Sequence, residues 1–165
     1  MMNPDPSFPA ARSALALVLA VTALLLLSGC RTAPPLPPAN FSEPGWHVQQ
    51  GQAVWKPRAS APEIAGEILL ATHPSGRTLV QFTKSPFPLV AAQSGSNRWE
   101  IQFVPENRTF RGRGQPPGYF SWLQLAPALA THPLPKGFTF TPPGASPWRL
   151  DNRESGEFIE GYFFP

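Results

Sequence analysis

The pattern of apolar and polar positions divides this chain into three parts. Residues 14–27 are almost entirely apolar, and residues 31–45 are rich in proline without a pattern that would form a core. From residue 46 onward, apolar and polar residues alternate with a period of two, and turn sequences interrupt the alternation about every ten residues. This alternation predicts a β-rich domain in the last part of the chain.

We expect strands that are buried on one face and exposed to solvent on the other. The sequence RWEIQF at residues 98–103 shows this most clearly, because its apolar residues alternate with arginine, glutamate and glutamine. In the preceding segment, residues 85–97, Pro86 and Pro88 exclude a regular central strand at the start. The other expected strands lie at residues 46–55, 63–72, 77–84, 108–114, 137–141, 148–152 and 157–164.

One segment has the periodicity of a helix. Residues 119–130 place Trp122, Leu125 and Leu129 on one side of a helix, and we expect Pro127 to kink or split it. The residues thus predict a mainly β (α+β) fold, a twisted antiparallel sheet with a short helical segment packed on one face.

The position of the single cysteine indicates where the protein resides. One cysteine excludes an internal disulfide bond and a zinc site built from cysteines. The apolar run before Cys30 is shorter than the roughly 20 residues of a membrane-spanning helix and has the layout of a secretory signal peptide. The sequence LSGC at residues 27–30 resembles the lipobox of bacterial lipoproteins, which implies cleavage before Cys30 and a lipid on its side chain. An ordinary secretory signal followed by a free cysteine is the alternative.

These features predict three regions. Residues 1–29 form a signal peptide that is removed, residues 30–45 carry the lipid on Cys30 and form a proline-rich tether, and residues 46–165 form a single domain. As polyproline II, the tether could span up to roughly 45 Å. The resemblance to bacterial lipoproteins also implies that Arg31 permits transfer to the outer membrane. We therefore expect a lipid-anchored protein of the bacterial cell envelope that faces the periplasm, with the membrane as its first partner.

Composition and motifs give no positive case for catalysis. The formal net charge of +3 is too small to indicate nucleic acid as a partner. His47, His73 and His132 lie far apart and lack the spacing of metal ligands. Glu157 and Glu160 have an odd spacing on an expected strand and so face opposite sides, which disfavours an acid/base pair. We expect no metal, no cofactor, no catalytic residue and no enzymatic activity, although an envelope-anchored hydrolase stays open.

The arrangement of these segments is similar to that of the LolA/LolB group of lipoprotein carriers and receptors. The similarity rests on GEILLAT, GRTLVQFTKSPFPLVAA, RWEIQF, RTFRGRG and SWLQLAPAL, followed by a terminal β-hairpin. It implies a curved, unclosed half-barrel sheet with an apolar cavity that takes acyl chains of lipids or lipoproteins. The residues implied for the lining of that cavity are Leu79, Phe82, Trp99, Ile101, Phe103, Trp122 and Leu125.

The resemblance also implies an exposed apolar loop, for which SPFPL at residues 85–89 is the counterpart. Phe87 and Leu89 could touch membrane or cargo there, or they could tuck under the sheet, just as the lining residues could fill an ordinary core. Two classes of function therefore remain. An apolar cavity would favour binding of lipid or lipoprotein acyl chains, in lipoprotein localisation to the outer membrane. A filled core with an exposed apolar patch would favour a structural or adaptor lipoprotein of an envelope complex.

Overall fold

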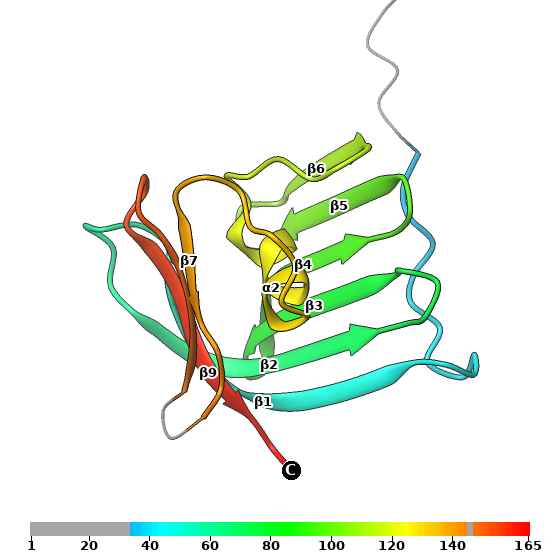
Figure 1. Ribbon diagram of the computed structural model, residues 1–165, viewed down its shortest axis with the longest axis horizontal. Helices are drawn as coiled ribbons and strands as arrows, with labels where there is room; N and C mark the ends of the chain where they lie inside the picture. Colours follow the sequence, from blue (N-terminus) through cyan, green and yellow to red (C-terminus); the bar gives the residue numbers. More distant parts are fainter. Residues whose placement is uncertain (1–33, 145–146) are drawn as a thin grey trace, which may run out of the picture. The chain divides into compact units, whose positions relative to one another are not determined.

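The computed structural model describes residues 34–144 and 147–165, and within them the chain forms one antiparallel sheet and one α-helix (Figure 1). The nine strands lie in the order β6-β5-β4-β3-β2-β1-β9-β8-β7. The elements are β1 (His47–Lys56), β2 (Ile64–Thr72), β3 (Thr78–Lys84), β4 (Phe87–Ser94), β5 (Arg98–Phe103), β6 (Arg108–Arg113), α2 (Ser121–Leu129), β7 (Phe138–Thr141), β8 (Trp148–Asn152) and β9 (Glu157–Phe163). The predicted fold class is confirmed, because β6 and β7 form the edges of a single unclosed sheet.

The register explains why alternating sequences form this sheet. Directly paired residues lie on the same face, and side chains alternate along each strand. Phe82 pairs with Val90, and Val90 pairs with Phe103, so three apolar side chains from three strands share one face. Trp55 pairs with Ile159 on the same face, which connects the meander β1–β6 to β9, β8 and β7. This face carries the core.

The sheet curls around α2, which lies against its concave face (Figure 1). Two glycines permit the close packing that this curvature requires. A Cβ atom on Gly161 would collide with the backbone oxygen of Gln52 and with the ring of Trp148, and one on Gly112 would collide with the ring of Trp99. Glycine is used at these positions because a backbone or an indole ring occupies the space of a side chain.

The helix continues through Pro127, so of the two expected effects of this proline, a kink or a split, the split is wrong. Proline removes one backbone hydrogen bond, but the helix ends only two residues later at Leu129. Nearly every residue of α2 is buried against the sheet, and such packing supplies most of the stability of a short helix in a protein.

β4 begins at Phe87 and therefore includes Pro88. The pairing of β3 with β4 shifts in register between Phe82 and Thr83, and Thr83 is the partner of Pro88. The proline thus lies at an irregularity of the ladder, where a missing amide donor is tolerated. The expectation that the strand is not regular at its start agrees with this register shift.

The proline-rich residues before β1 contact the sheet, which differs from the expected tether. The backbone N–H of Leu36 donates a hydrogen bond to Glu100 Oε2 at 3.0 Å, and Arg77 pairs with Glu43 at 2.6 Å. Figure 1 shows this segment passing the ends of several strands before it enters β1. The expected signal peptide and Cys30 lie outside the described residues. Within those residues, no helix is long and apolar enough to cross a membrane.

Candidate functional site

Most of the residues expected to line an acyl-chain cavity lie together between the sheet and α2. They form part of one apolar cluster to which the strands and the helix both contribute. Of the six expected lining residues in this cluster, five are buried and one is partly buried. The buried ones are Phe82, Trp99, Ile101, Trp122 and Leu125, and the partly buried one is Phe103.

Leu79 lies on the opposite, convex face of the sheet. Its neighbour Val80 belongs to the core cluster, and consecutive side chains of a strand point to opposite faces. Leu79 is nevertheless only 9% exposed. The prediction that it shares a lining with the other residues is wrong, because Leu79 and Val80 are consecutive in β3 and their side chains point to opposite faces.

The space between the described core residues is filled. Phe82, Ile101 and Leu125 have 0% relative accessible surface, whereas a side chain beside a water-sized void would keep some. The Phe82 and Trp122 rings stack with their centroids 5.1 Å apart, and Trp55 meets Trp122 edge-on at 5.6 Å. In this conformation α2 packs directly against the strand residues that were expected to line an acyl-chain cavity.

The carboxylate of Glu157 connects the first residue of α2 to the sheet through hydrogen bonds. Glu157 Oε2 accepts a hydrogen bond from Ser121 Oγ at 2.5 Å, and Glu157 Oε1 accepts one from Trp55 Nε1 at 2.8 Å. Ser121 is the first residue of the helix, where a negative charge is favoured by the helix dipole. Burial raises the pKa of Glu157 above its ordinary value, and the two hydrogen bonds offset part of this increase.

Sequence reasoning missed this role of Glu157, although it correctly separated Glu157 from Glu160. Glu160 Oε2 accepts a hydrogen bond from Arg149 Nη1 at 2.8 Å on the convex face. Glu157 has the same parity as Ile159 and therefore points inward. That parity was a usable signal, but the partners of Glu157 come from β1 and α2, which only the fold brings together.

Two buried indole groups in the same interior have no acceptor among the described residues. The Nε1 atoms of Trp122 and Trp148 are buried and donate no hydrogen bond there. A buried donor without a partner costs about 1–3 kcal/mol.

In the apolar loop expected at residues 85–89, the two large apolar side chains differ in exposure. Phe87 is 70% exposed, whereas Leu89 is partly buried against the core cluster. The two residues border an open apolar groove of about 370 Å³ that Lys84, Pro88, Val104 and Pro105 complete. Of Phe87 and Leu89, Phe87 is the one whose side chain is largely exposed to a partner.

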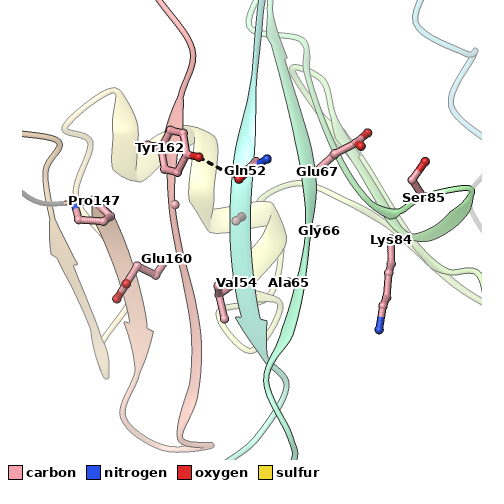
Figure 2. Close-up of a pocket in the computed structure, with 12 residues that line it drawn as sticks. Gln52, Val54, Ala65, Gly66, Glu67, Lys84, Ser85, Pro147, Glu160 and Tyr162 are labelled. Carbon is pink, nitrogen blue, oxygen red and sulfur yellow. Dashed lines mark hydrogen bonds between the residues drawn. The ribbon is translucent and has the colours of Figure 1, made fainter.

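A second groove, of about 400 Å³, lies on the convex face where β1 meets β2 and β9 (Figure 2). Val54 and Ala65 contribute apolar surface, while Glu67 and Lys84 add charges of both signs. Tyr162 closes one side by donating a hydrogen bond to Gln52 at 2.8 Å. This mixed lining is a poor match for an acyl chain, which carries no polar atoms along its length.

The described residues contain no group of three or more His, Cys, Asp or Glu that could hold a metal ion. His73 instead contacts a neighbour and the proline-rich segment: Ser75 Oγ lies 2.7 Å from its Nδ1 atom, and the Pro44 carbonyl lies 3.2 Å from its Nε2 atom. The arrangement that stands out is thus an apolar interior closed by a short helix. No protein-family model matches the chain, and no curated protein matches it significantly.

Proposed function

We propose that this is a non-enzymatic, lipid-anchored protein of the bacterial envelope whose β domain binds acyl chains of lipids or lipoproteins. The observation that carries the proposal is the unclosed sheet, which curls around an apolar interior and has a single short helix against its concave face in the described residues. If α2 moved away, the apolar concave face of the sheet would be exposed and could receive an acyl chain.

The helix is suited to such an exchange. Its N-cap, Phe120, makes no side-chain capping bond, its first turn carries no acidic residue, and Pro127 removes one of its backbone hydrogen bonds. Glu157 supplies the polar contact that holds its first residue. A helix of this kind depends on packing for its stability rather than on its own sequence.

Burial of the α2 side chains and burial of an acyl chain contribute free energies of the same order. Full burial of Trp122, Leu123 and Leu125 contributes roughly 1.5–3 kcal/mol for each side chain, or roughly 5–9 kcal/mol for the three. An acyl chain of about 14 buried methylene groups contributes roughly 11 kcal/mol at about 0.8 kcal/mol per group. An acyl chain can therefore compensate for the loss of the helix contacts.

The anchor belongs to the same proposal, and it rests on the sequence LSGC before position 31. Replacing Cys30→Ala should leave the protein without lipid. We expect the variant to lose quantitative partition into the detergent phase, whereas the wild-type chain enters that phase. Quantitative partition of the variant would contradict the lipidation proposal.

Acyl-chain binding is tested on residues 33–165, exported to the periplasm behind a cleavable signal and analysed by native mass spectrometry with lipid extraction. We expect about one acyl chain per protein, and faster hydrogen exchange of the α2 amides when palmitate is added. The amides of β1 and β2 are the internal control and should keep their protection. A lipid-free monomer whose α2 exchange does not respond to palmitate would contradict the proposal.

A second candidate function is a structural or adaptor lipoprotein of an envelope complex. The filled interior favours it, as do exposed aromatic side chains that a protein partner could cover, namely Phe87, Tyr119, Tyr162 and Phe164. The lipid-free outcome above would select this candidate. Cross-linking in intact cells from a photoreactive residue at position 87 would then identify the partner.

A further inference from the structure

The proline-rich segment before β1 is fixed to one end of the sheet. This end, called the Arg98 end, comprises the β2–β3 turn (73–77), the β4–β5 turn (95–97) and the end of β6. Leu36 is hydrogen-bonded to Glu100, Glu43 is paired with Arg77, and the Trp46 ring lies 5.2 Å from that of His73. Because these contacts are distributed along the segment, the segment cannot act as a free tether over residues 36–46.

The length of chain before this segment limits how far the domain can stand from its anchor. Leu36 lies only six positions after Cys30, with five residues between them. A fully extended chain of that length spans about 20 Å, less than half the reach of the tether expected from the sequence. The opposite end of the sheet carries Phe87 and lies farther away by the length of a strand, roughly 23 Å for β3. A lipid on Cys30 would therefore hold the Arg98 end next to the membrane surface.

Two arginines at this end face each other, and the part of the chain that the structure describes supplies neither with an ion-pair partner. Arg98 and Arg113 are directly paired across β5 and β6, so their side chains leave the sheet on the same face. Among the described residues, no carboxylate lies within ion-pair distance of either guanidinium. The adjacent cross-strand pair is neutralised, because Arg111 Nε lies 2.9 Å from Glu100 Oε2. Like charges in direct cross-strand positions are destabilising unless an anion joins them.

We propose that the Arg98 end of the sheet docks on the anionic phospholipid headgroups of the membrane that holds the anchor, and that Phe87 is directed away from that membrane. The inference rests on the proposed lipid anchor at Cys30 but not on acyl-chain binding in the interior. Phosphate-bearing headgroups fit two adjacent guanidinium groups, which bind phosphate through planar, charge-assisted hydrogen bonds. On this arrangement Phe87 meets cargo or a partner rather than the anchoring bilayer.

The test uses the mature, lipidated chain in vesicles. Acylation occupies the thiol of the single cysteine, so Ser96→Cys in the exposed β4–β5 turn provides one labelling site and Ser60→Cys in the β1–β2 turn provides a second, at the opposite end. Each label is a fluorophore, quenched by a nitroxide on the lipid headgroup. In vesicles that contain phosphatidylglycerol, we expect stronger quenching at position 96 than at position 60, and a smaller difference in pure phosphatidylcholine.

The variant Arg98→Gln/Arg113→Gln should remove this preference in phosphatidylglycerol vesicles. We expect the docked population to fall by about fivefold for each arginine, the value for roughly 1 kcal/mol per basic residue at an anionic surface. The matched control is Arg58→Gln/Arg153→Gln, which removes the same charge from two exposed arginines at the Phe87 end. The control should leave the quenching at position 96 unchanged.

The possible outcomes separate the docking surface from the anchor. If the protein does not float with the vesicles, the anchor is absent and the inference falls with it. If the protein floats but positions 96 and 60 are quenched equally, or if both double variants act alike, the docking surface is wrong while the anchor stands. Release of the Arg98 end by inorganic phosphate at constant ionic strength would indicate a site for free anions and would also overturn the proposal.

Discussion

The two ends of the strands share one core but carry different chemistry. The Arg98 end holds the proline-rich segment and two arginines that have no ion-pair partner among the described residues, whereas the Phe87 end has an exposed phenylalanine beside a groove formed largely by prolines and aliphatic residues. The difference follows from the meander, in which consecutive turns alternate between the ends of the sheet. Residues close in sequence, such as Phe87 and Arg98, are thereby separated by the length of a strand. One small domain can thus present two ends of different chemistry.

The largest expected loss of stability comes from a substitution in the core that both ends share. Trp122→Ala should lower the free energy of unfolding by about 3–5 kcal/mol, because it deletes a buried indole that packs on Phe82 and Trp55. Urea unfolding followed by circular dichroism measures the loss. Phe87→Ala is the control and should change the free energy by less than about 0.5 kcal/mol, because that ring is exposed. Equal losses in the two variants would show that the core does not depend on α2.

The next effect concerns the carboxylate that fastens α2. Glu157→Ala leaves the Ser121 hydroxyl and the Trp55 indole without their acceptor and should cost about 2–4 kcal/mol in the free energy of unfolding. The amides of α2 should exchange faster with solvent in this variant than in Glu160→Ala. Glu160 lies on the convex face, where it pairs with Arg149, so its loss should cost about 1 kcal/mol or less. Unchanged exchange in α2 would contradict the role of Glu157.

The same carboxylate predicts a pH dependence with a defined sign. Burial raises the pKa of Glu157 in the folded protein above its ordinary value of 4.5, so the folded state binds this proton more tightly than the unfolded chain. The contribution to stability is fully present below pH 4.5 and is lost as the pH rises through the folded pKa. Glu157→Gln should lack this loss, which urea unfolding at a series of pH values would show. A constant difference between variant and wild type across that range would refute it.

A smaller effect is expected at the Arg98 end alone. Glu100→Ala removes the acceptor of the Leu36 amide and the partner of Arg111, and should cost about 1 kcal/mol because both contacts are partly exposed. The more sensitive measurement is limited proteolysis within residues 34–46, which should become faster. Glu106→Ala is the control, since the exposed pair of Glu106 with Arg108 lies at the other end. Equal cleavage rates in both variants would argue against docking of the segment.

The smallest effect on stability is expected at the Phe87 end. Phe87→Glu should change the free energy of unfolding by less than about 0.5 kcal/mol but should weaken transfer of an acylated cargo, because it puts a charge on the apolar tip. A transfer assay between micelles and the lipidated protein measures this. Tyr119→Glu is the matched control, because Tyr119 is an equally exposed aromatic residue outside the tip. A large loss of stability in Phe87→Glu would instead show that the ring is part of the core.

The strands and the helix could be predicted from the sequence, because their patterns are local. The alternation at residues 98–103 reappears as β5, and the helical spacing of Trp122 and Leu125 reappears as α2. Faces were harder to predict, as Leu79 shows: its apolar character gave no indication that its side chain lies on the face opposite to that of Val80. The contacts that hold residues 36–46 against the sheet were also not predicted. A proline-rich composition indicates an extended conformation, but it does not indicate which residues the segment will contact.

The sequence by itself determined the fold class and the candidate anchor at Cys30. Both depend on patterns within short stretches, where the period of apolar residues or the order of residue types is sufficient. Only the tertiary structure decided that α2 fills the concave face, that Glu157 meets Ser121 and Trp55, and that Arg98 faces Arg113 at the end opposite to Phe87. These are contacts between residues distant in the chain or set by strand register, and the energy that selects them comes from packing that no local pattern encodes.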